Sequence, residues 1–130
     1  MCRRAIEPRY GYWTLPAGFM ENAETTIEAA ARETLEEALA EVTIEGLYSI
    51  IDVPHINQVH MFYRASLKDG QFGAGEESLE SRLFSPGEIP WDEISFPTVR
   101  KTLELFLLDM ETERFGVHVS DIRHPMGKKA

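Results

Sequence analysis

Residues 13–40, with the sequence WTLPAGFMENAETTIEAAARETLEEALA, predict a turn, a polar loop and then an acidic helix. Thr25 is a favourable N-cap, and Glu28 has the spacing to complete a capping box. Apolar residues after Thr25 recur at helical spacing. They are Ile27, Ala30, Ala31, Leu35 and Ala38. We therefore expect a helix over residues 25–39 with one apolar side.

Three glutamates gather on one arc of this expected helix. At about 100° per residue, Glu33, Glu36 and Glu37 fall beside the apolar face rather than opposite it. Like charges at these spacings repel, so the cluster requires a cation or water. Mg²⁺ prefers a few carboxylate and carbonyl oxygens and commonly bridges to substrate phosphates. The cluster by itself fits either a magnesium site or a solvated acidic face, and for a bare Arg-Glu-x-x-Glu-Glu run the solvated face is the commoner outcome.

The complete spacing of the stretch is more specific than the glutamates alone. Gly18 is followed after five residues by Glu24, after seven more by Arg32-Glu33, and after two more by Glu36-Glu37. This spacing resembles the signature of the Nudix hydrolases, and residues 13–18 resemble the lead-in of many family members. The charged positions of the signature are all present.

Two positions depart from that signature. Leu39 stands where the family pattern has a glycine, and Thr34 stands where it usually has an aliphatic residue. Glycine reaches a left-handed C-terminal conformation at little cost, so we expect the end of the helix to be altered. The metal site should be unaffected.

The resemblance covers residues 2 to about 110 and is closest to the branch of FAD and ADP-ribose pyrophosphatases. It implies an α+β fold, an α/β/α sandwich with a mixed sheet between the helices of residues 25–39 and 98–110. Residues 2–5 resemble the second core strand, so the first core strand is apparently missing from this chain. We expect one domain over residues 1–122, a mobile tail over residues 123–130, and a homodimer that covers an exposed edge through residues 115–122.

The resemblance also implies an activity, namely Mg²⁺-dependent (or Mn²⁺-dependent) cleavage of a nucleoside diphosphate derivative, with ADP-ribose or FAD as the leading substrates. Glu36 and Glu37 would bind the metal, and Glu33 would be a ligand or the catalytic base. Gly18 or Ala17 would lend a backbone carbonyl to the metal. The chemistry alone points only to a metal-assisted phosphoanhydride hydrolase, in which these carboxylates hold metal and take a proton from water.

Other residues are assigned to the substrate and to supporting contacts. Glu24 and Arg32 are expected to form an orienting ion pair. Arginines near the N-terminus are expected to bind substrate phosphate, and a histidine in a loop after a strand is a further possible contact. These residues are Arg3, Arg4, Arg9 and His55. A further acid is expected from the glycine-rich loop of residues 71–80, for which the candidates are Glu76, Glu77 and Glu80.

The remaining elements follow from alternation and helical spacing. Residues 42–53 and 58–67 are rich in β-branched and aromatic residues and predict an antiparallel pair of strands. We expect short strands over residues 82–85 and 115–122, and Trp91 on the edge of the core. His55 and His60 fit a loop residue and a strand residue better than a zinc site, because no third ligand is near them.

Composition limits the class of protein. The 130 residues suffice for one domain with its own core, and no apolar run is long enough to span a bilayer. The net charge of −9 argues against a nucleic-acid binder that relies on a broad basic surface. A single cysteine and the lack of an apolar signal segment make the cytoplasm the expected location.

Two alternatives to an enzyme stay open at this point. The chain could be a catalytically impaired Nudix-fold module that binds a nucleotide, or its acidic helix could be purely structural. Intact Glu33, Glu36 and Glu37 favour the enzyme, because a module without catalysis has no need to hold three repelling carboxylates together. The signature does not identify the cleft residues that select adenine or flavin, so NADH and nucleoside triphosphates also remain open as substrates.

Overall fold

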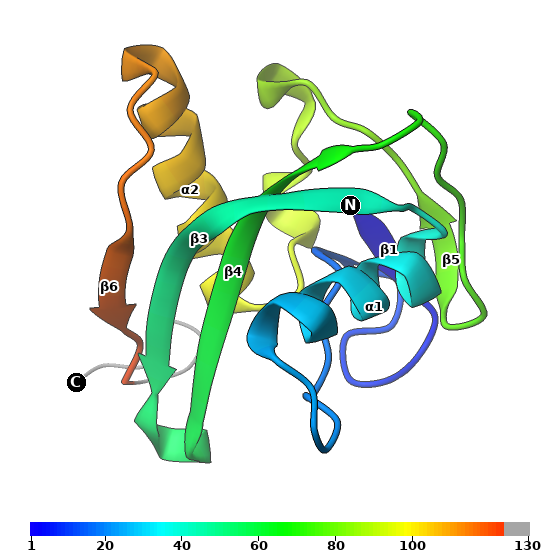
Figure 1. The fold of residues 1–130 in the computed structure, drawn as a ribbon, viewed down its shortest axis with the longest axis horizontal. Coiled ribbons are helices and arrows are strands. Elements are labelled where there is room, and N and C mark those ends of the chain that lie inside the picture. The colour runs from blue at the N-terminus through cyan, green and yellow to red at the C-terminus, as the bar shows by residue number, and fades with distance from the viewer. Residues whose placement is uncertain (124–130) are drawn as a thin grey trace.

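The computed structural model describes residues 1–123, and the expected tail lies outside this range except for Arg123. The described chain contains six strands, two α-helices and three short 3₁₀ helices (Figure 1). The strands are β1 (Cys2–Arg4), β2 (Trp13–Thr14), β3 (Val42–Val53), β4 (Gln58–Leu67), β5 (Ser78–Ser81) and β6 (His118–Asp121). The helices are α1 (Thr26–Ala38), α2 (Pro97–Thr112), η1 (Pro54–Ile56), η2 (Pro86–Glu88) and η3 (Trp91–Glu93). None of the helices in this range is long and apolar enough to cross a membrane.

The strands form two sheets of three strands each. One sheet is antiparallel with the order β2-β1-β5. The other has the order β4-β3-β6 and is mixed, because β3 pairs antiparallel with β4 and parallel with β6. Strand β1 is paired on both sides, so no open edge lies beside it in residues 1–123.

The two α-helices pack on opposite faces of the β3–β4 pair, as expected from the sequence. Successive side chains of a strand point to opposite faces. On β4, the Tyr63 hydroxyl is 2.5 Å from the hydroxyl of Thr26 in α1, whereas His60 Nδ1 is 2.8 Å from the hydroxyl of Thr98 in α2. These two β4 residues differ by an odd number of positions, so the helices they contact lie on opposite sides.

A core of aromatic and branched side chains joins the N-terminal sheet to α2. Trp13, Ile94 and Val99 are buried together, and Trp91 packs against them as expected. The rings of Trp13 and Phe84 meet edge to face, with centroids 5.0 Å apart. The burial of apolar and aromatic side chains such as these is the main favourable contribution to the stability of a domain.

The structure buries only part of the predicted apolar side of α1, in which Ala38 is 7% exposed. Ala29 is buried, whereas Ile27 and Leu35 are 50% and 48% exposed. At about 100° per residue, Ala29 shares a side with Glu33 and Glu37 and lies away from Ile27 and Leu35. The helix is therefore oriented by its carboxylates and alanines, and its larger apolar residues face outward.

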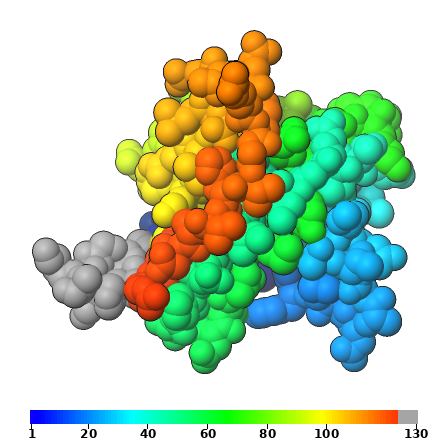
Figure 2. All heavy atoms as spheres, turned by 60° about the vertical axis from the view of Figure 1, so that its left-hand side comes forward, coloured from blue at the N-terminus to red at the C-terminus, as the bar shows by residue number. Residues whose placement is uncertain are grey.

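One strand prediction was wrong, and another is confirmed over a shorter range. The strand expected over residues 82–85 is absent, and β5 instead covers Ser78–Ser81, inside a stretch expected to be a loop. Its composition is poor in strand-forming residues, and its extended conformation comes from pairing with β1. Strand β6 falls within residues 115–122 but pairs with β3 of the same chain, along which the orange-red segment runs in Figure 2.

Candidate active site

A cleft of about 370 Å³ lies between α1, β1, the turn before α1 and the segment that leads into β5. It is lined by Glu33, Glu36 and Glu37 of the signature, together with two arginines and two further glutamates. The lining residues are Cys2, Arg4, Ile6, Thr14, Ala17, Gly18, Glu21, Arg32, Glu33, Glu36, Glu37, Glu77 and Ser78. The signature stretch and β5 therefore meet at one site.

Gly18 is required by the position of Glu33. A Cβ atom on Gly18 would lie 2.5 Å from the carboxyl carbon and from both carboxyl oxygens of Glu33. The Glu33 side chain is only 13% exposed, so it occupies the space that a side chain at position 18 would fill. The glycine of the signature thus makes room for the carboxyl group of Glu33.

The Glu37 carboxyl group lies beside that of Glu33 in the cleft. The backbone N–H of Ala17 donates to Glu37 Oε1 at 3.2 Å. Burial, followed by the hydrogen bond to Glu33 and the repulsion from it, raises the pKa of Glu37 to about 8. Two partly buried carboxyl groups that are hydrogen-bonded to each other share a proton or require a cation. Hard oxygen donors of this kind suit Mg²⁺, so the residues present fit the metal that the family implies.

Arg32 binds the carboxylates on both sides of it. Its guanidinium makes a bidentate contact with Glu24, at 2.5 Å and 3.1 Å, which confirms the expected ion pair. It also donates to Glu33 at 2.7 Å and to Glu36 at 3.3 Å. These contacts raise the pKa of Arg32 and lower that of Glu24. As the side chains stand, no group of three or more His, Cys, Asp or Glu residues in residues 1–123 is arranged to hold a metal ion.

Of the three N-terminal arginines, the structure brings only Arg4 into the cleft. Arg3 precedes Arg4 on β1, so its side chain points to the opposite face of the sheet. There it donates to the carbonyl of Gly11 at 2.9 Å and pairs with Glu80 at 3.3 Å. Arg9 donates to the carbonyl of Ser95 at 2.8 Å. Arg4 likewise donates to the carbonyl of Pro8 at 2.7 Å, so what distinguishes it is that it lines the cleft with the signature glutamates, whereas Arg3 and Arg9 do not.

Among the three further acids, Glu77 is the one that lines the cleft. Glu80 is engaged with Arg3 on the opposite face of the sheet, and Glu76 is exposed outside the lining. His55 lies in η1 at the far end of the β3–β4 hairpin and does not line the cleft either. The pairing of β5 with β1 places Glu80 beside Arg3, whereas Glu77 lies just before β5 and lines the cleft.

The helix end differs from the expectation for a missing glycine. Leu39 itself adopts the left-handed conformation, with φ 49° and ψ 36°. The carbonyl groups of the last helical turn accept hydrogen bonds from Gly73 and Gly75 of the segment before β5. The sequence predicted a further acid from this segment, but it did not predict the hydrogen bonds of the segment to the end of α1.

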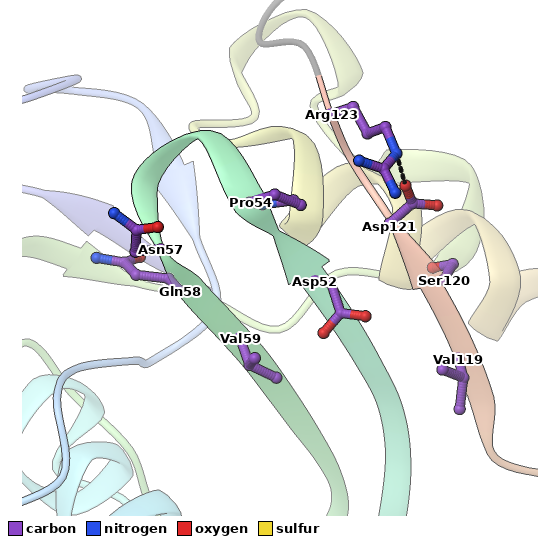
Figure 3. A pocket seen from close by; sticks show the side chains of 9 residues that line it. All are labelled: Asp52, Pro54, Asn57, Gln58, Val59, Val119, Ser120, Asp121 and Arg123. Carbon is purple, nitrogen blue, oxygen red and sulfur yellow. Dashed lines mark ion pairs between the residues drawn. The ribbon is translucent and has the colours of Figure 1, made fainter.

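A second hollow lies on the open face formed by β3, β4 and β6, away from the signature helix (Figure 3). Asp52 and Val59 point into it from the hairpin, and Val119 lines it from β6. Arg123 beside it is paired with Asp121 at 2.9 Å. None of the residues assigned to the reaction lines this hollow.

The model of the NUDIX domain matches residues 1–106 of the chain. The chain belongs to the Nudix hydrolase family. A Nudix hydrolase of known structure from Nitrosomonas europaea is 49% identical, with a TM-score of 0.92 over 95% of this chain and 70% of that one. The structure of an ADP-ribose pyrophosphatase from Streptococcus suis has a TM-score of 0.67 over 84% of this chain and 82% of that one, and at 24% identity it supports the fold alone.

Curated Nudix relatives carry two different substrate names. An 8-oxo-(d)GTP phosphatase from Mycolicibacterium smegmatis is 28% identical over 102 residues, or 77% of this chain. An ADP-ribose pyrophosphatase from Methanocaldococcus jannaschii is 30% identical over 94 residues, or 69% of this chain. The aligned part of the chain spans 31% of the length of the first relative and 56% of the second. The family is therefore shown, and the branch within it is not settled.

Proposed function

We propose that this Nudix protein hydrolyses the diphosphate of a nucleoside derivative with the help of a divalent metal ion. The observation that carries the proposal is the convergence of Glu33 and Glu37 in the cleft, with Glu36 beside them and Arg4 and Glu77 in the same lining. A diphosphate is anionic, so it requires the positive charge that a metal and Arg4 provide.

The roles of the side chains follow from their positions. Glu33, Glu36 and Glu37 would hold the metal, which when bound neutralises the diphosphate and lowers the pKa of water. Arg4 would bind a phosphate oxygen, because it is the arginine of the N-terminal group that faces the cleft. Glu77 would accept the proton of the attacking water, because it lines the cleft, and Glu33 is the other candidate for that base.

ADP-ribose is the substrate we favour, with FAD next. The relative from Methanocaldococcus jannaschii, named for ADP-ribose, supports this choice, as does the resemblance to the branch of FAD and ADP-ribose pyrophosphatases. A second candidate is 8-oxo-dGTP, which is supported by the name of the relative from Mycolicibacterium smegmatis. The two classes differ in which bond is broken, so their products distinguish them.

The test is incubation with ADP-ribose, FAD, NADH and 8-oxo-dGTP in the presence of Mg²⁺, with products separated by chromatography. ADP-ribose should give AMP and ribose 5-phosphate, and chelation of the metal should abolish the reaction. Glu76→Gln, which changes an exposed glutamate outside the cleft, is the matched control for substitutions of the signature glutamates. If no diphosphate is hydrolysed but a nucleotide binds, the impaired binding module becomes the better description.

A further inference from the structure

The segment from Gly73 to Ser78 is attached to the last turn of α1 by hydrogen bonds. The N–H of Gly73 donates to the carbonyl of Ala38 at 2.7 Å, and the N–H of Gly75 donates to the carbonyl of Glu37 at 3.1 Å. The Ser78 hydroxyl donates to the same Glu37 carbonyl at 2.9 Å. A helix leaves its last carbonyls unpaired, so this segment completes the end of α1.

The approach between this segment and the helix is one of backbone to backbone. A Cβ atom on Gly75 would lie 1.8 Å from the carbonyl oxygen of Glu36 and 2.9 Å from its carbonyl carbon. Backbone atoms cannot turn aside as the end of a side chain can. The segment is therefore held at a fixed distance from the residues that carry the signature carboxylates.

A β-bulge aims Ser78 at that helix. Arg3 pairs with Glu80, but the next residue, Arg4, pairs with Ser78, so Leu79 is skipped. In a regular register Leu79 would lie opposite Arg4 and face the cleft. Here Leu79 has no partner on β1, and its side chain is 44% exposed. Bulges occur next to active sites where they redirect a side chain. The skipped residue places Ser78 on the same face of the sheet as Arg4.

We propose that Ser78 is a positioning residue of this site. By holding the carbonyl of Glu37, its hydroxyl sets the distance between the Glu37 carboxylate on α1 and Glu77, the residue that precedes Ser78 in the chain. This inference rests on the proposed function, because it concerns the metal-binding side chains assigned above. A hydroxyl with a merely structural role would affect stability and leave metal affinity unchanged.

The experiment compares Ser78→Ala with Ser78→Thr, which keeps the hydroxyl on a residue suited to a strand. Ser66→Ala, at an exposed serine of β4, is the matched control. Mn²⁺ affinity is measured without substrate from the electron paramagnetic resonance signal of free Mn²⁺. The thermal midpoint, and kcat and KM for ADP-ribose, are measured on the same proteins.

We expect Ser78→Ala to weaken Mn²⁺ binding and lower kcat by about tenfold, the lower end of the effect of removing a supporting contact of a metal ligand. The KM for ADP-ribose should change less, and Ser78→Thr should restore most of both losses. Should Ser78→Ala not fold, Ser78→Cys, a weak donor, replaces it under the same criteria.

Two outcomes would overturn the inference. Unchanged Mn²⁺ affinity in Ser78→Ala, beside an unaltered protein that binds Mn²⁺ and turns over substrate, would remove the positioning role and leave the proposed function standing. An unaltered protein that neither binds Mn²⁺ nor hydrolyses any diphosphate would remove both.

Discussion

Replacing Gly18 by alanine tests whether the cleft geometry of Glu33 matters for the reaction. The added Cβ would lie 2.5 Å from the Glu33 carboxyl group, and ordinary contact begins at 3.4 Å, so the carboxyl must retreat by about 0.9 Å (3.4 − 2.5). Gly18 does not have a positive φ, so alanine is compatible with its backbone. The substitution therefore moves one carboxylate while leaving the fold in place.

The expected loss of activity is large compared with the loss of stability. A misplacement of about 1 Å in a catalytic group can cost about 100-fold in rate, which corresponds to about 2.7 kcal/mol in the barrier. The Glu33 side chain is the flexible partner in the clash, so the thermal midpoint should fall by no more than a few degrees. We expect kcat/KM for ADP-ribose with saturating Mg²⁺ to fall about 100-fold.

The control for this prediction is Gly87→Ala. A Cβ on Gly87 would meet no atom within 4 Å, so this variant should keep both activity and stability. If Gly18→Ala retains more than a third of the wild-type kcat/KM, the close contact between Gly18 and Glu33 does not control the reaction. A drop of more than 10 °C in the thermal midpoint would instead mean that the backbone has moved.

Four further predictions concern metal binding, the helix end, acid stability and assembly. Glu37→Gln removes charge from the metal site at nearly constant volume, so kcat should fall by orders of magnitude in assays with saturating Mg²⁺ while circular dichroism stays unchanged. Leu39→Gly should raise the thermal midpoint by a few degrees and Leu39→Val should lower it, because Leu39 has φ 49° and only glycine adopts this conformation without strain. The hydrogen bond from the Tyr48 hydroxyl, and then that from His118, lowers the pKa of Asp109. A carboxylate whose pKa is lowered in the folded protein stabilises the fold at pH values above its unfolded pKa of 3.8. This contribution is lost as the pH falls through the folded pKa. Asp109→Asn should therefore weaken the acid dependence of thermal unfolding below about pH 4. Strand β6 ends the order of its sheet, and an edge strand can pair with a second copy, so light scattering at micromolar concentration should give the mass of a homodimer. A monomeric mass would contradict that expectation.

The helix and the long strands were predictable because their signals are local. The capping box of Thr25 and Glu28 is present as the sequence indicated. Strands β3 and β4 match the two alternating runs at both ends. In each of these elements the residues that decide the structure are neighbours in the chain.

The position of β5 and the choice of arginine were not predictable in the same way. Strand β5 takes its conformation from β1, which lies more than 70 residues earlier in the sequence. Alternation along a strand indicates that Arg3 and Arg4 point to opposite faces, but it does not say which face meets α1. That choice depends on the pairing of β1 with both of its neighbours, which no local pattern reports.

The geometry of the site depends on two segments whose backbones approach α1 closely, and the signature contains only one of them. Gly18 makes room for the Glu33 carboxylate, and it lies at a fixed spacing from the glutamates. Gly75 makes room for the backbone of Glu36 in the last turns of the helix, and it lies outside the signature. A chain with every signature residue but a side chain at position 75 would place its carboxylates differently. The signature therefore identifies which side chains take part, whereas contacts between distant segments determine where those side chains meet.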